Sequence, residues 1–187
     1  MPPAAGPYIA AFKFLQEDFR RVGEYIALTD DNLGAYSHRL FEILLRSCTE
    51  FESLCKDLLV ERGYSKPARD MNITDYRSLE GPWHFESISV GVLTWLPEAA
   101  YVSPFQGWSS AQPPLPWYAS YNQVKHNRHN AFAQASLANV RDAIAGQFAL
   151  MAEVSLVSQN STSFQERKAR DGRRELVYPG YDFSIVV

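Results

Sequence analysis

The sequence has few cysteines, few glycines and no long apolar run. Its 187 residues include 2 cysteines and 10 glycines, which excludes a disulfide-stapled scaffold and a collagen-like chain. No stretch of about 18 residues is both uncharged and strongly apolar, as a membrane span requires. The residues before Lys13 lack the basic start and apolar core of a secretory signal. We therefore expect a cytoplasmic protein that makes no use of a membrane.

An excess of positive charge is also absent. The formal net charge is −3 and the pI is about 5.8, so no broad positive field is available to attract nucleic acid. What is present is a composition of 46% hydrophobic and 13% aromatic residues. That composition and length are typical of one globular domain with a single core.

The two cysteines are expected to be reduced. Cys48 and Cys55 are seven residues apart in a segment of helical periodicity, which separates them by about 10 Å along the helix axis. A disulfide cannot close over that distance. We therefore expect two thiols packed in the core and no metal or other cofactor.

Apolar periodicity predicts helices over residues 10–28, 33–62, 117–130 and 133–158. Residues 29–32 supply capping chemistry for the second helix, and Gly63 follows its end. On a helical wheel the second helix has a broad apolar stripe that predicts packing against at least two neighbours. The stripe comprises Phe41, Leu44, Cys48, Phe51, Cys55, Leu58 and Leu59, and Leu40, Leu45 and Leu54 widen it.

The rest of the chain is less regular. We expect a loose leader over residues 1–9, and an irregular, proline-rich insertion over residues 64–116 with a short helix at 73–79 and a strand within 85–95. Residues 159–187 are expected to form a charged loop followed by a β-prone tail, in a terminal hairpin or edge strand. The predicted fold class is mainly α: one helical bundle with a small β element from the insertion and the tail.

Several charged residues fall where apolar residues are expected. Glu52 lies within the apolar arc of the second helix, and Arg128 shares a face of the third with Trp117, Tyr121 and Val124. Because a buried unpaired charge is costly, a Glu52–Arg128 pair between the two helices is the simplest arrangement.

The density of cationic and polar groups around Arg128 also predicts a functional site. Lys125, His126 and Arg128 are the candidate catalytic residues, because such groups can bind phosphate charge or transfer protons. The candidate substrate-binding residues are Tyr121, Asn122, His129, Glu52, Lys56 and His38.

The third helix carries a pattern that resembles the WYxxYNxVKHxR signature of an uncharacterised bacterial family. The helical plan resembles the HEPN superfamily of nucleotide- and RNA-associated bundles. That resemblance implies a defence-type or toxin–antitoxin protein, acting on or binding RNA or a nucleotide, with a homodimer as the expected assembly. The arginine–histidine pair of many HEPN ribonucleases does not recur after Arg128, where Ala133 and Gln134 stand.

Two classes of function therefore remain open. In the first, the Lys125–His126–Arg128 cluster binds or cleaves RNA, and Glu52 and Asn122 orient it. In the second, the protein is a non-catalytic interaction module whose Glu52–Arg128 network holds helices together. A small-molecule hydrolase using the same polar residues is a third and weaker possibility.

Overall fold

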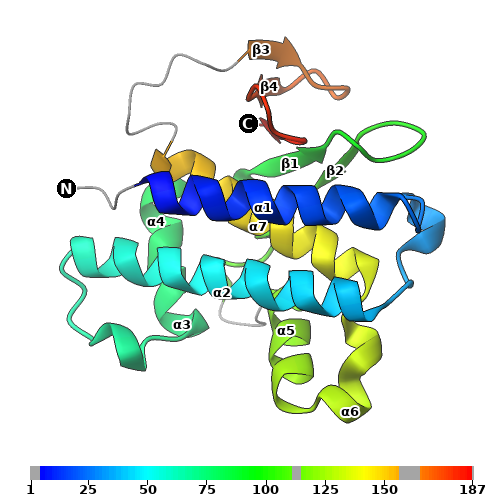
Figure 1. Ribbon diagram of the computed structural model, residues 1–187. Coiled ribbons are helices and arrows are strands. Elements are labelled where there is room, and N and C mark those ends of the chain that lie inside the picture. Colours follow the sequence, from blue (N-terminus) through cyan, green and yellow to red (C-terminus); the bar gives the residue numbers. More distant parts are fainter. Residues whose placement is uncertain (1–4, 111–114, 156–164, 187) are drawn as a thin grey trace.

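Three long helices form the centre of the computed structural model, which describes residues 5–110, 115–155 and 165–186 (Figure 1). They are α1 (Ala5–Gly23), α2 (His38–Glu61) and α7 (Leu137–Ser155), and each packs against the other two. Helix α1 already begins at Ala5, so the part of the expected leader that the structure describes, residues 5–9, is helical. Residues 1–4 lie outside the described part.

The apolar stripe predicted for α2 is confirmed. All of its seven principal members are buried between α1, α7 and α5 (Pro116–His126). The helix begins at His38, later than expected, because the Ser37 side chain accepts a hydrogen bond from the Leu40 amide at 3.1 Å and caps it. Residues 30–32, expected to cap α2, instead form a separate 3₁₀ turn, η1 (Asp30–Asn32).

The expected insertion is built from short elements. The helix predicted at 73–79 is present as α3 (Ile73–Tyr76) and η3 (Arg77–Leu79). Asn72 caps α3 through its side chain. The other short helices are η2 (Ala68–Asp70), α4 (Glu80–Trp83), η4 (Phe85–Ser87), α6 (Arg128–Ala131) and η5 (Phe132–Gln134).

The expectation of a mainly helical bundle is wrong, because five strands form one antiparallel sheet. They are β1 (Ser89–Val92), β2 (Ala100–Val102), β3 (Gln165–Lys168), β4 (Arg174–Val177) and β5 (Phe183–Val186), in the order β2-β1-β5-β4-β3. The insertion and the tail thus contribute to a single layer, and the fold is α+β. Residues 165–174, expected within a charged loop, supply β3 and the start of β4; residues 156–164 lie outside the described part.

The sheet covers the side of the helices formed by α1 and α7 (Figure 1). Phe183 of the central strand β5 contacts this layer, with ring centroids 5.6 Å from Phe12 of α1 and 5.5 Å from Phe148 of α7. On the opposite side of the helices, α5 packs against α2 and α7. The molecule therefore has a sheet on one side, three long helices in the middle and the α5–α6 corner on the other.

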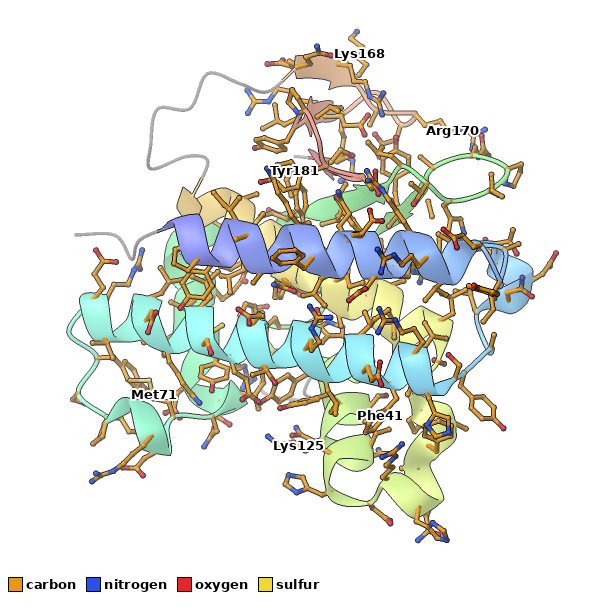
Figure 2. All side chains as sticks on the ribbon, in the orientation of Figure 1. Phe41, Met71, Lys125, Lys168, Arg170 and Tyr181 are labelled. Atoms are coloured by element: carbon orange, nitrogen blue, oxygen red, sulfur yellow. The ribbon has the colours of Figure 1, made fainter. Side chains whose placement is uncertain are left out.

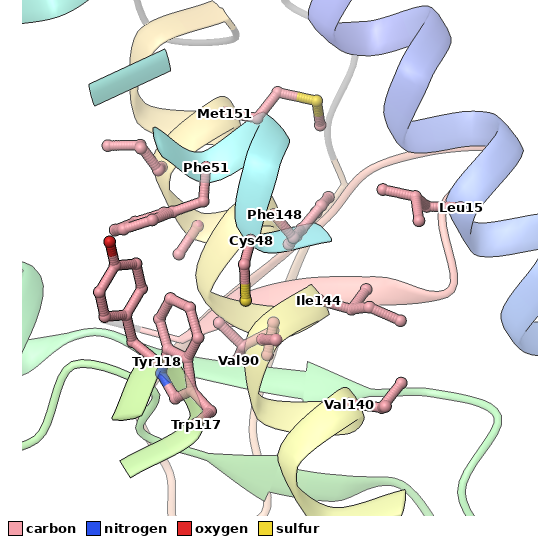
Figure 3. Close-up of a cluster of buried hydrophobic side chains, with 14 of the residues drawn as sticks. Leu15, Cys48, Phe51, Val90, Trp117, Tyr118, Val140, Ile144, Phe148 and Met151 are labelled. Carbon is pink, nitrogen blue, oxygen red and sulfur yellow. The ribbon is translucent and has the colours of Figure 1, made fainter. Parts of the chain in front are cut away.

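The core beneath α5 is rich in aromatic rings and contains Cys48 (Figure 3). Both cysteines are buried and free, so the expectation of reduced core thiols is confirmed. Burial raises the pKa of each thiol well above its ordinary value, which keeps both groups protonated and unreactive.

Among residues 5–110, 115–155 and 165–186, no helix is both long enough and apolar enough to cross a membrane.

Candidate functional site

The helix expected over residues 117–130 is divided in two. Helix α5 ends at His126, and Asn127 leaves the helical conformation with φ −140° and ψ 50° before α6 begins at Arg128. The Asn127 side-chain oxygen accepts a hydrogen bond from the side-chain amide of Asn130 at 3.1 Å, and asparagine is among the residues that disfavour a helix interior. Arg128 is therefore directed independently of the buried face of α5.

Trp117 fixes the beginning of α5. Pro116 occupies the first helical position, and the Trp117 indole donates a hydrogen bond to the Pro104 carbonyl at 2.8 Å. A Cβ atom at Gly146 of α7 would lie 3.0 Å from the Trp117 ring, so only glycine leaves the indole in unstrained contact. This close approach packs the beginning of α5 against α7.

Glu52 has a tyrosine as its partner. The buried Tyr118 hydroxyl donates a hydrogen bond to Glu52 Oε1 at 2.7 Å, and burial together with this bond raises the pKa of Tyr118. Arg128 is exposed and bonds elsewhere. The predicted Glu52–Arg128 pair is therefore wrong, because the break at Asn127 turns Arg128 away from the α2–α5 interface.

Lys125 belongs to the same interface as Glu52. Its ammonium donates a hydrogen bond to the Tyr121 hydroxyl at 2.9 Å and lies 4.9 Å from the centre of that ring. The bond to Tyr121 raises the pKa of Lys125, and the charge of Glu52 adds to the increase. We call Glu52, Tyr118, Tyr121 and Lys125 the tyrosine cluster. Two hydrogen bonds join its members in pairs, Tyr118 with Glu52 and Lys125 with Tyr121.

Arg128 instead lies at the beginning of α2. An open pocket of about 470 Å³ is lined by His38, Arg128, His129 and Phe132. We call these four residues the α6 pocket. His38 is the first residue of α2, so the pocket also lies at the positive end of that helix dipole. The lining combines a guanidinium, two imidazoles and an aromatic ring.

Two contacts hold Arg128 in the pocket. Its Cζ atom lies 4.4 Å from the centre of the Phe41 ring, and its Nη2 lies 3.0 Å from His38 Nδ1. Because a guanidinium can only donate, His38 Nδ1 is the acceptor in this contact. Figure 2 shows Phe41 beside the α5–α6 corner, with Lys125 on a different side of α5.

No carboxylate within the described ranges forms an ion pair with Arg128, in contrast to the arginines of α2 nearby. Arg39 pairs with Asp18 and Glu42, and Arg46 also pairs with Asp18. The guanidinium of Arg128 thus has its stacking face occupied by Phe41 and one N–H group by His38, which leaves other N–H groups for an anionic ligand.

The structure divides the predicted site residues. His38, Arg128 and His129 meet in the α6 pocket, and Glu52, Tyr121 and Lys125 meet in the tyrosine cluster. His126 is exposed at the end of α5, while Asn122 and Lys56 are half-buried. Within the described segments, no group of three metal-ligating side chains is close enough to hold a metal ion.

Sequence reasoning missed Phe41 and Phe132 as parts of the site. Phe41 was read only as a core residue, and it is indeed buried. Phe132 follows α6 in η5, and its ring centroid lies 4.8 Å from that of His38. The signal that could have identified it is a single phenylalanine three residues after His129, one helical turn from the Arg128-His129 pair.

A second group of interacting charged residues, which the sequence does not predict, lies on the outer face of the sheet. Glu175 of β4 is only 1% exposed. Its carboxylate accepts hydrogen bonds from Arg167 Nε at 2.7 Å, from Arg167 Nη2 at 3.1 Å and from Ser184 Oγ at 2.5 Å. A Cβ atom at Gly91 would lie 2.3 Å from Ser184 Oγ and 3.0 Å from Tyr101, so glycine is required beside this network.

The charge of Glu175 is satisfied internally. Burial raises the pKa of its carboxyl group, but the hydrogen bonds from Arg167 and Ser184 outweigh burial and hold the pKa below its ordinary value of 4.5. This network therefore stabilises the sheet and offers no free charge to a ligand.

No protein-family model, curated protein or solved structure matches this chain.

Proposed function

We propose that this protein binds a phosphate-bearing ligand, RNA or a nucleotide, in the α6 pocket. The observation that carries the proposal is the environment of Arg128: an exposed guanidinium, stacked on Phe41 and beside two imidazoles, with no carboxylate among its contacts in the described chain. Charge-assisted hydrogen bonds from a guanidinium to phosphate oxygens are among the strongest in proteins. Since the net charge is −3, such contact is local.

The proposal is for binding, with cleavage as a separate question. Of the expected catalytic residues, Lys125 donates a hydrogen bond to Tyr121, and Arg128 donates one to His38 and keeps other N–H groups for a ligand. His126 lies between them at the end of α5. Cleavage is measured by incubating labelled RNA with the wild type and with His126→Ala. If the wild type cleaves the RNA and the variant does not, the protein is a ribonuclease as well as a binding protein. The setting that we propose is the cytoplasm, where free cysteines stay reduced.

The binding test compares two arginines near the same end of α2. In Arg128→Ala we expect the affinity for single-stranded RNA to fall about tenfold or more, and the slope of log K against log salt to decrease by about one. Arg39→Ala is the matched control: it removes the same charge from the residue next to His38, but that guanidinium is engaged by Asp18 and Glu42. Equal affinities for Arg128→Ala and the wild type, measured by fluorescence anisotropy, would refute the proposal.

A second function, a non-catalytic interaction module, has its own supporting observation. The Tyr118–Glu52 hydrogen bond joins α5 to α2, and the Arg128 contacts with His38 and Phe41 join α6 to α2. If these groups serve only to hold helices together, Arg128→Ala will lower stability strongly and leave RNA binding unchanged. The two functions therefore predict opposite effects of one substitution.

A further inference from the structure

An aromatic surface adjoins the α6 pocket. The rings of Tyr36 and Phe132 meet edge to face, with centroids 5.8 Å apart and an interplanar angle of 90°. Arg128 Cζ lies 5.9 Å from the centre of the Phe132 ring. Phe132 is half-buried and lines the pocket, and Tyr36, which is 53% exposed, adjoins the pocket through its ring contact with Phe132.

The backbone holds Tyr36 firmly although its ring is exposed. Tyr36 forms an isolated antiparallel bridge with Ser136. On either side of this bridge, the Leu137 amide donates to the Ala35 carbonyl at 2.8 Å and the Ala138 amide donates to the Leu33 carbonyl at 3.1 Å. A tyrosine side chain has few rotatable bonds, so a ring on such a fixed backbone can be covered by a ligand at low entropic cost.

We propose that the Tyr36–Phe132 surface is a stacking site for an unpaired nucleobase whose phosphate is held by Arg128 and His129. The inference rests on the proposed function and makes it more specific: the ligand is single-stranded RNA. A nucleotide joins a planar base to a phosphate through one sugar, and Arg128 and Phe132 offer the two matching groups within 5.9 Å. In double-stranded RNA the bases are paired and stacked on each other, so they cannot reach an aromatic side chain.

The test uses two fluorescein-labelled probes of about ten nucleotides, a length within the usual range for single-strand sites. One is single-stranded RNA and the other is the same backbone with abasic sugars. The wild type should bind the RNA more tightly than the abasic probe. Tyr36→Ala should weaken RNA binding about 5- to 150-fold, the usual effect of removing an aromatic side chain that stacks on one base, and leave binding of the abasic probe unchanged.

Two control variants separate stacking from other effects. Tyr36→Phe keeps the ring and should bind RNA as the wild type does. Tyr25→Ala removes a tyrosine that is 86% exposed, has no ring or cation contact in the described part of the chain and does not line the pocket; it should have no effect on either probe. Circular dichroism of Tyr36→Ala should match that of the wild type, since the bridge to Ser136 is formed by the backbone.

The remaining outcomes refute either the stacking site alone or the stacking site together with the proposed function. If Arg128→Ala weakens binding of both probes but Tyr36→Ala has no effect, the phosphate site stands and the stacking site is refuted. If blunt double-stranded RNA binds as tightly as single-stranded RNA, or if Tyr36→Ala weakens both probes equally, stacking is again refuted. If neither probe binds the wild type, both the stacking site and the proposed function fail.

Discussion

Arg167 on the sheet and Arg128 on α6 place the same guanidinium group at the protein surface, but with different partners. Arg167 lies beside Tyr101 and covers the buried carboxylate of Glu175 with two hydrogen bonds. Arg128 stacks on Phe41 and has no carboxylate partner within the described residues. The Arg167 charge therefore stabilises the sheet, whereas the Arg128 charge is available to a ligand.

The largest expected effect on stability is that of removing the sheet carboxylate. Glu175→Ala should lower the free energy of unfolding by about 2–3 kcal/mol, because it removes charged hydrogen bonds and leaves the buried Ser184 hydroxyl without its acceptor. Urea denaturation measures the change. Glu166→Ala, an exposed position on neighbouring β3, is the control and should stay within about 0.5 kcal/mol of the wild type. A similarly small change in Glu175→Ala would contradict the structural role of the network.

The pH dependence of stability gives a second effect. Because the folded-state pKa of Glu175 lies below its ordinary value, its contribution is fully present above the unfolded-state pKa and is lost as the pH falls through the folded-state pKa. Stability should therefore fall on acidification below about pH 4.5, and it should fall less steeply in Glu175→Gln, which has no proton to gain. Melting temperatures from pH 7 to lower pH, compared between the two proteins, check this. Identical slopes would show that Glu175 is not held ionised by the fold.

The smallest expected change in stability comes from a substitution in the α6 pocket. Arg128→Ala should lower the free energy of unfolding by no more than about 1 kcal/mol, the usual value of a cation–π contact at an exposed position. The measurement is again urea denaturation, alongside the binding assay described above. A loss of several kcal/mol with RNA binding intact would remove the contrast with Arg167 and favour the interaction module.

The helices could be predicted from the sequence more readily than the sheet. The stripe of α2 repeats over many turns and leaves a strong periodic signal. The strands have three or four residues each. The strand expected within residues 85–95 is present as β1, but β1 is buried at every position, and its sequence does not show which strands pair with it. Strand β3 is exposed throughout and entirely polar. Its pairing with β4, and that of β4 with β5, depends on partners rather than on local sequence.

The candidate site could be predicted only in its residue types. The density of cationic groups around Arg128 was visible in the sequence, and His38 was among the candidate site residues. The division at Asn127 was not visible, since residues 117–130 contain neither glycine nor proline, and Pro116 just before them suits the first turn of a helix. Glu175 was missed for a related reason. It follows Arg173 and Arg174, and only the three-dimensional arrangement of Arg167 and Ser184 shows that it is buried.

The central position of β5 determines when the sheet can form during synthesis. This strand, residues 183–186, lies between β1 and β4, so the sheet cannot form as one layer until a ribosome has delivered it. Before then β1 and β2 can pair only with each other, and such a two-stranded piece is marginally stable. The helices carry many local contacts and can form earlier. A nascent chain is therefore expected to pass through a stage in which its helices are packed while the edge of β1 is still open.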